Sequence, residues 1–130
     1  PINIFSEFNE RNLGETENIT EQFWLQQLKN EDTKTSNGES QKEVRNRMLK
    51  GIKKVLENIK DNESAVIVSH ATAITFLLMN WCELINATLE GKKRHLKHKG
   101  KTIINDSFKT PEIFKLTFKT NKEIIDICRI

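Results

Sequence analysis

Apolar residues concentrate in one short central run of this chain. The run is Ala65-Val66-Ile67-Val68, which is rich in β-branched side chains and bounded by polar residues, as is typical of a buried strand in a parallel sheet. The mostly apolar segment 72–84 follows and is long enough for a helix. His70 therefore stands where a predicted strand ends and a predicted helix begins.

Two further helices are predicted from capping residues and apolar spacing. The first extends from Thr20, its N-cap, to Leu28. The second begins after a capping box of Ser40 and Glu43 and ends near residue 61. Its apolar residues recur at helical spacing: Val44, Met48, Ile52, Val55, Leu56 and Ile59.

Short strands are predicted around these helices, and the last two form an antiparallel hairpin that turns at residues 120–122. Residues 91–101 are predicted to be a basic loop. Because strands alternate with helices, we expect one α/β domain over residues 1–130, with a mainly parallel sheet flanked by helices. The short strands are expected at residues 2–5, 102–104, 113–118 and 123–127.

Composition narrows the function classes. The net charge is +3 over 130 residues, which is too small to argue for nucleic-acid binding. No apolar window is long enough to span a bilayer, and no signal-peptide pattern opens the sequence. Cys82 and Cys128 lie in apolar surroundings and indicate buried thiols rather than a disulfide. We expect a cytoplasmic protein that binds neither nucleic acid nor membrane.

The position of His70 suits phosphate binding. Open α/β sheets bind ligands at the carboxyl ends of their strands, and a helix start presents N–H groups and positive potential to an anion. The N–H of Ala71 is placed to donate to such an anion. The alternative for His70 is a core histidine that is hydrogen-bonded to a neighbouring strand.

Four segments resemble motifs of the histidine phosphatase superfamily, which includes the cofactor-dependent phosphoglycerate mutases. The order and spacing of these segments agree with the superfamily over most of the chain. The segments are Phe8 to Glu17 with Glu10-Arg11, Gly38-Glu39-Ser40 with Arg47, Val66 to Ile74 around His70, and Ile104-Asn105-Asp106-Ser107.

The resemblance implies a three-layer sandwich and phosphoryl transfer through a phosphohistidine. It identifies His70 as the second histidine, which stabilises the transferring phosphoryl oxygens, and Glu10 as the proton donor to the leaving oxygen. It also implies that Arg11 and the Ala71 N–H bind a phosphorylated small-molecule substrate. No cofactor and no metal is implied, because His and Arg supply the positive charge.

Two departures from the superfamily pattern stand out. Ala71 occupies the position that is usually Gly, and no Arg-His-Gly occurs, so the nucleophilic histidine is absent from the chain. The one Arg-His pair, Arg94-His95, is followed by Leu96 inside the predicted basic loop. We therefore expect the C-terminal portion of an incomplete sandwich, inactive alone, whose nucleophile comes from a missing N-terminal segment or a second chain. The strand at 65–69 should then expose an unpaired edge.

Several alternatives stay open at this point. Hydrolysis of a small phosphomonoester is the first expectation, phosphoglycerate mutase activity the second, and a non-catalytic phosphate-binding or interaction module the third. Instead of a catalytic acid, Glu10 could be a solvated loop carboxylate. Instead of binding substrate, Arg11 could form a surface salt bridge. Arg47 is expected to hold its helix or a loop in place. His95 and His98 fit a solvated basic loop better than a metal pair.

Overall fold

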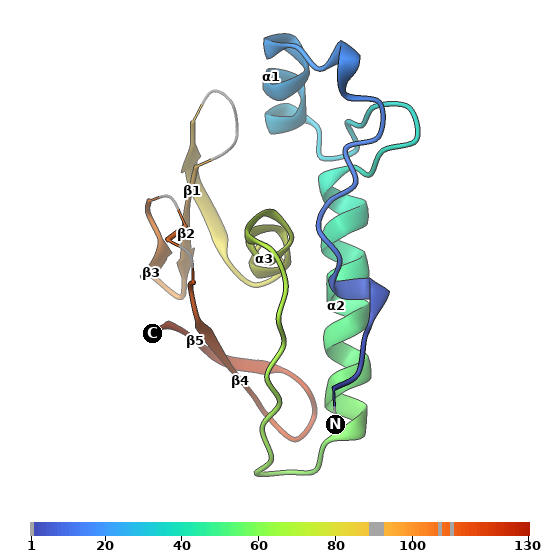
Figure 1. Cartoon of the computed structure of the whole chain (residues 1–130). Coiled ribbons are helices and arrows are strands. Elements are labelled where there is room, and N and C mark those ends of the chain that lie inside the picture. The colour runs from blue at the N-terminus through green and yellow to red at the C-terminus, as the bar shows by residue number, and fades with distance from the viewer. Residues whose placement is uncertain (1, 89–92, 107, 110) are drawn as a thin grey trace.

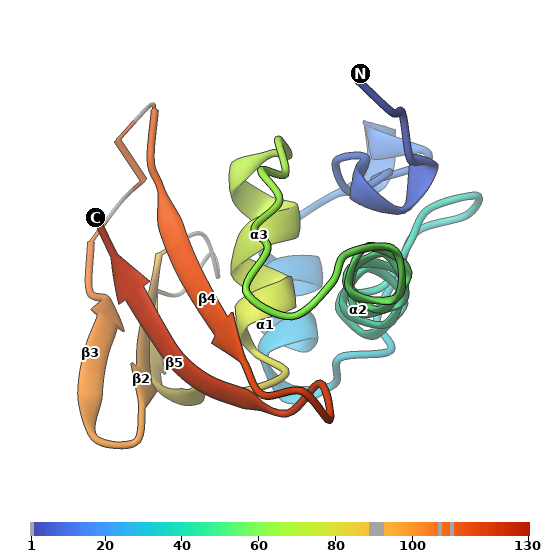
Figure 2. The same cartoon turned by 90° about the horizontal axis from the view of Figure 1, so that it is seen from below.

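Helices and two small antiparallel sheets build this chain, and one helix lies between the sheets and the longest helix (Figures 1 and 2). The computed structural model describes residues 2–88, 93–106, 108–109 and 111–130. The helices are α1 (Glu21–Lys29), α2 (Gln41–Asn58) and α3 (Ala71–Leu78), with short 3-10 helices η1 (Ser6–Phe8) and η2 (Thr16–Asn18). The strands are β1 (Glu83–Ala87), β2 (Arg94–His98), β3 (Lys101–Ile104), β4 (Phe114–Phe118) and β5 (Ile124–Arg129).

Capping residues set the starts of α1 and α2 as the sequence predicts. The Thr20 hydroxyl accepts a hydrogen bond from the Phe23 N–H, and the Ser40 and Glu43 side chains complete a reciprocal capping box. The third helix is shorter than predicted, because the chain leaves α3 at Leu78 and enters β1 at Glu83. None of the described helices combines the length and the apolar character needed to cross a membrane.

The strand pairing corrects the expected sheet. In the described residues β1, β2 and β3 pair antiparallel, as do β4 and β5, so a mainly parallel sheet is not confirmed. The predicted hairpin of β4 and β5 is present. The sheet arrangement follows from tight turns, since antiparallel strands need only a short connection whereas parallel strands need a long crossover.

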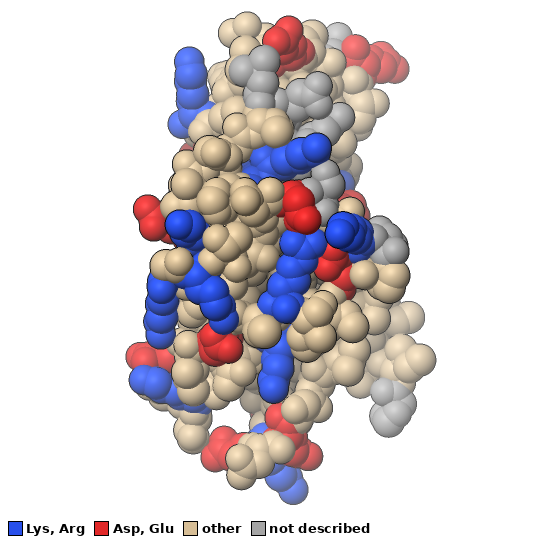
Figure 3. Space-filling model, turned by 90° about the vertical axis from the view of Figure 1, so that its left-hand side faces the viewer, with Lys and Arg blue, Asp and Glu red and all other residues tan. Residues whose placement is uncertain are grey.

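Much of the predicted basic loop is a β-hairpin. Residues 94–98 form β2, and Lys99 and Gly100, with φ of 50° and 79°, turn the chain into β3. Two successive residues with positive φ are typical of the two-residue turns that join antiparallel strands. Residues 91 and 92 of the predicted loop, and Ser107 of the last motif, lie outside the described residues. On the face that Figure 3 shows, Lys and Arg side chains lie among scattered acidic side chains. Lys101 pairs with Asp126 at 3.0 Å.

Two apolar clusters lie on opposite sides of α3. The first joins α3 to α2 and η1 and includes Phe8, Val44, Met48 and Phe76. The second joins α3 to both sheets: Leu78, Leu96, Ile103, Ile104 and Ile127. Burial of these side chains fixes α3, and with it the position of His70 at the start of that helix.

Two extended segments with apolar side chains pair with no strand among the residues that the structure describes. They are residues 2–5 and 65–69, both of which the sequence predicts as strands. Ile67 packs against the first cluster, whereas Val66 and Val68 are 94% and 87% exposed. Ile2 and Ile4 are 95% and 92% exposed. The strands expected at residues 2–5 and 65–69 are therefore not formed in the described structure, because neither segment pairs with another strand.

Candidate functional site

His70 is the N-cap residue of α3 and lies at the surface. Its backbone is extended, with φ of −120° and ψ of 157°, and its carbonyl accepts the first helical hydrogen bond from Ile74 at 2.9 Å. Its side chain makes no capping hydrogen bond and is exposed. His70 is therefore not a core histidine, and it stands at a helix start, a place that favours anions.

The carboxylate of Glu10 lies at the same helix start. It accepts hydrogen bonds from the N–H groups of Ala73 at 2.9 Å and Thr72 at 3.3 Å, and from its own neighbour Arg11 at 2.8 Å. A negative charge at this place interacts favourably with the helix dipole. Glu10, which stands 60 positions before His70 in the sequence, thus binds the first turn of the helix whose N-cap residue is His70.

Ala71 presents its backbone to the same place. The residue is exposed, and its N–H donates to no acceptor among the residues that the structure describes. The methyl group that replaces the superfamily's usual Gly hydrogen thus leaves the backbone accessible.

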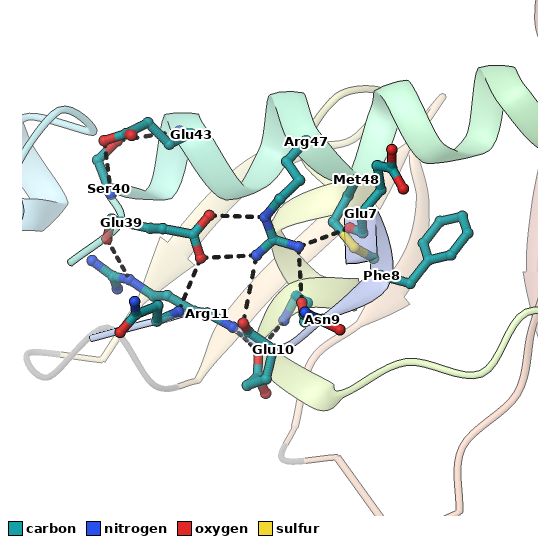
Figure 4. A network of polar contacts seen from close by, with 12 residues as sticks. Glu7, Phe8, Asn9, Glu10, Arg11, Glu39, Ser40, Glu43, Arg47 and Met48 are labelled. Atoms are coloured by element: carbon teal, nitrogen blue, oxygen red, sulfur yellow. Dashed lines mark hydrogen bonds and ion pairs between the residues drawn. The ribbon is translucent and has the colours of Figure 1, made fainter. Parts of the chain in front are cut away.

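Arg47 holds the opening loop against α2 (Figure 4). Its guanidinium donates to both oxygens of Glu39 at 2.8 and 2.9 Å and to the carbonyls of Glu7 at 2.7 Å and Asn9 at 2.9 Å. Burial opposes ionisation of Glu39, but the hydrogen bonds from Arg47 and from the Asn12 N–H outweigh it and keep the pKa of this carboxyl below its ordinary value. Arg47 therefore acts on the site through the loop that carries Glu10.

Replacing Arg47 by Met is expected to lower the free energy of unfolding by about 3 kcal/mol, because Glu39 and two carbonyls lose their donor. Urea denaturation measures the change. Lys34→Met is the matched control, since it breaks the exposed Lys34–Glu43 pair and should cost under about 0.5 kcal/mol. Equal losses in the two variants would contradict the proposed role of Arg47.

Arg11 is buried rather than part of a surface salt bridge. Its side chain is 8% exposed, and it donates to the Glu39 carbonyl at 3.0 Å and to Gln27 Oε1 at 2.8 Å. Its Nη2 is buried and has no hydrogen-bond partner among the described residues. Desolvation lowers the pKa of Arg11, while the carboxylates of Glu39 and Glu10 act in the opposite direction.

Sequence reasoning missed Arg94, which is 4% exposed on β2. Arg94, Leu96 and His98 alternate as the buried residues of this strand, so the prediction of a solvated His98 is wrong. Leu96 is the single apolar residue between Arg94 and His98, so the sequence carried no alternation that could have shown this burial. Within the described part of the chain, no three His, Cys, Asp or Glu side chains are grouped as a metal site.

Comparisons with known proteins add one finding. The chain matches the family model of the histidine phosphatase superfamily (branch 1) over residues 1–104. It matches no curated protein and no solved structure. The matched range contains His70, Glu10, Arg11 and Ala71.

Proposed function

The chain belongs to the histidine phosphatase superfamily, and from this membership we propose that it forms part of a phosphoryl-transfer enzyme that hydrolyses a small phosphomonoester. The observation that carries the proposal is that the Glu10 carboxylate binds N–H groups in the first turn of the helix whose N-cap residue is His70. A carboxyl group, an imidazole and a free helix N–H are the groups needed around a transferring phosphoryl group.

In the first step a histidine outside these 130 residues attacks phosphorus. A P–N bond forms while the P–O bond to the leaving group breaks, and Glu10 gives its proton to the leaving oxygen. His70 and the Ala71 N–H stabilise the negative charge on the equatorial oxygens, and Arg11 binds the substrate. In the second step water attacks phosphorus, so that a P–O bond forms while the P–N bond breaks, and Glu10 takes the proton from that water. The histidine is released as a free imidazole, and inorganic phosphate leaves the site.

The acceptor contacts of Glu10 support its part in the second step. Both carboxylate oxygens accept from N–H groups, which hold the side chain at the start of α3. After it delivers its proton to the leaving group, the same side chain is in place to take the proton from the hydrolytic water.

The nucleophile is proposed to arrive on a strand that docks against residues 65–69. This segment pairs with no strand among the described residues, its side chains Val66 and Val68 are exposed, and it ends directly at His70. A strand that adds here would pair its backbone with the open edge and place its carboxyl end beside His70. An N-terminal segment of the same protein or a second chain would supply it.

Two other functions compete with hydrolysis. Phosphoglycerate mutase activity is the second candidate, because Asn9-Glu10-Arg11 resembles the mutase form of this loop. A non-catalytic phosphate-binding or interaction module is the third. Conversion of 3-phosphoglycerate to 2-phosphoglycerate identifies the mutase, and phosphate binding without turnover identifies the module.

The test is hydrolysis of p-nitrophenyl phosphate by the protein extended with the coding sequence upstream of residue 1. His70→Ala is expected to lower kcat by about 10²–10³-fold, because one stabilising group of the transition state is lost. His95→Ala, a partly exposed histidine on β2, is the matched control and should keep kcat near that of the unchanged protein. Equal kcat values for His70→Ala and the unchanged protein would show that His70 is not a catalytic residue.

A further inference from the structure

A recess of about 400 Å³ lies between the C-terminal half of α2 and the turn that joins β4 to β5. Figures 1 and 2 both show this turn beside that half of α2. The volume is within the range of small-molecule sites, about 300–1,000 Å³. His70, Glu10 and Arg11 do not line the recess, so it is separate from the proposed phosphoryl-transfer site and does not rest on that proposal.

The walls of the recess are apolar and include two aromatic rings. Leu49, Ile52 and Leu56 recur at three- and four-residue spacing and so form one stripe along α2. Trp81 and Phe118 contact each other edge to face, with ring centroids 5.8 Å apart and ring planes at 73°. Both rings are only partly buried. The recess therefore keeps aromatic surface that a further ring can contact.

The rim of the recess is polar and offers mainly hydrogen-bond donors. Glu57 is paired with Lys122 at 3.7 Å. Asn121 Oδ1 accepts from the Glu123 N–H at 3.1 Å, which leaves the NH₂ group of this amide as a donor. Lys53 is exposed and forms no ion pair or hydrogen bond with any residue that the structure describes. These donors favour a ligand with a negatively charged head.

Backbone hydrogen bonds hold the turn that carries part of this rim. The Lys122 N–H donates to the Lys119 carbonyl at 2.8 Å, and the Lys119 N–H donates to the Glu123 carbonyl at 2.7 Å. Lys122 has a φ of 68°, a backbone conformation that is unfavourable for a residue other than Gly and that these bonds maintain. The rim is therefore formed before a ligand arrives, which reduces the entropic cost of binding.

We propose that this recess binds a small aromatic carboxylate, a ring that bears one carboxylate on a short carbon chain. The ring contacts Trp81 and Phe118, and the carboxylate accepts from the ammonium group of Lys53. A single negative charge matches the rim, where two lysines and one glutamate leave a balance of one positive charge. A phosphate monoester carries about −1.5 to −2 at pH 7, which exceeds this balance and increases repulsion from Glu57.

Amide NMR spectra of the isotope-labelled 130-residue chain, recorded during titration with sodium phenylacetate, test the proposal. The ionic strength is held constant with sodium chloride. Saturable shift changes are expected at residues 49–57 and 118–122. Acetate lacks the ring and should bind at least about tenfold more weakly, because the contacts with the apolar walls are lost. Phenylacetamide keeps the ring but lacks the charge, so it should bind about three- to fivefold more weakly.

Two lysine variants test the head of the ligand. Lys53→Gln should weaken phenylacetate about three- to fivefold and leave the affinity for phenylacetamide unchanged. Lys50→Gln, at an exposed position on α2 outside the recess, is the matched control and should bind phenylacetate as the unchanged chain does. The proposal is wrong if phenylacetate gives no saturable shift changes, if they lie outside the recess, if phenylacetamide binds as tightly, or if the two variants bind alike.

The protein extended upstream of residue 1 supplies a further test, because an upstream segment is another possible occupant of the recess. The extended protein should bind phenylacetate with the same Kd as the 130-residue chain. If the extension abolishes binding and itself shifts the amides of residues 49–57 and 118–122, the segment fills the recess and the proposed ligand site is wrong.

Discussion

Glu10→Gln is expected to slow hydrolysis of an alkyl phosphate such as β-glycerophosphate by about 10²–10⁴-fold in the protein extended upstream of residue 1. An alkoxide is a poor leaving group, so its departure needs the proton that Glu10 supplies. The amide of Gln keeps the size of the side chain and an acceptor for the Ala73 N–H, but it cannot transfer a proton. The measurement is kcat for this substrate beside kcat for p-nitrophenyl phosphate.

The leaving group makes this prediction specific. In the first step with p-nitrophenyl phosphate, the leaving oxygen needs little protonation. Glu10→Gln should therefore slow that step much less than it slows hydrolysis of the alkyl phosphate. The rate of the first step is measured from the burst of p-nitrophenol. Glu15→Gln is the control, since it removes the same charge from an exposed residue of the same loop. Equal losses on both substrates would show that Glu10 supports the structure of the loop and does not act as an acid.

The second large effect concerns the open edge at residues 65–69. The chain alone is expected to show no turnover of p-nitrophenyl phosphate, whereas the chain with its upstream segment, fused or added as a separate peptide, should turn it over. The segment should also slow amide hydrogen exchange at residues 65–69, because strand addition pairs these N–H groups. Turnover by the chain alone would contradict the proposed origin of the nucleophile.

The variant Val68→Lys distinguishes an effect on docking of the added strand from an effect on folding of the chain. Val68 is 87% exposed, so the change should alter the stability of the chain alone by less than about 0.5 kcal/mol. It should nevertheless lower the restored activity by a large factor, because a charge would then lie next to the side chains of the docked strand on the same face of the sheet. Ile113→Lys, at a position that is 58% exposed before β4, is the control and should leave the restored activity unchanged. If the two variants behave alike, the edge at 65–69 is not the docking surface.

Local sequence determined the elements whose signals are complete within a few residues. Ser40 and Glu43 cap the start of α2, as predicted. Thr20 caps the start of α1, also as predicted. The hairpin of β4 and β5 likewise follows from two short apolar runs around a turn. Such signals are readable because each hydrogen bond joins near neighbours, so no distant residue has to be known.

The motif resemblance predicted the family. It also identified four candidate site residues, His70, Glu10, Arg11 and Ala71. The residue types and their order along the chain were sufficient for this, and the family match covers all four. That Arg47 holds a loop in place was expected, but which carbonyls it binds, and how Glu10 reaches the start of α3, could not be predicted. Those contacts join residues that are more than 30 positions apart.

Only the tertiary structure decided which polar residues are buried and which apolar residues are exposed. Arg94 and His98 belong to a run that is basic throughout, yet β2 turns them inward because that face of the strand packs on the core. Val66 and Val68 have the sequence of a buried strand, yet they are exposed because nothing in the described chain lies against them. Burial depends on what surrounds a side chain, and a pattern of residues states only what the side chain prefers.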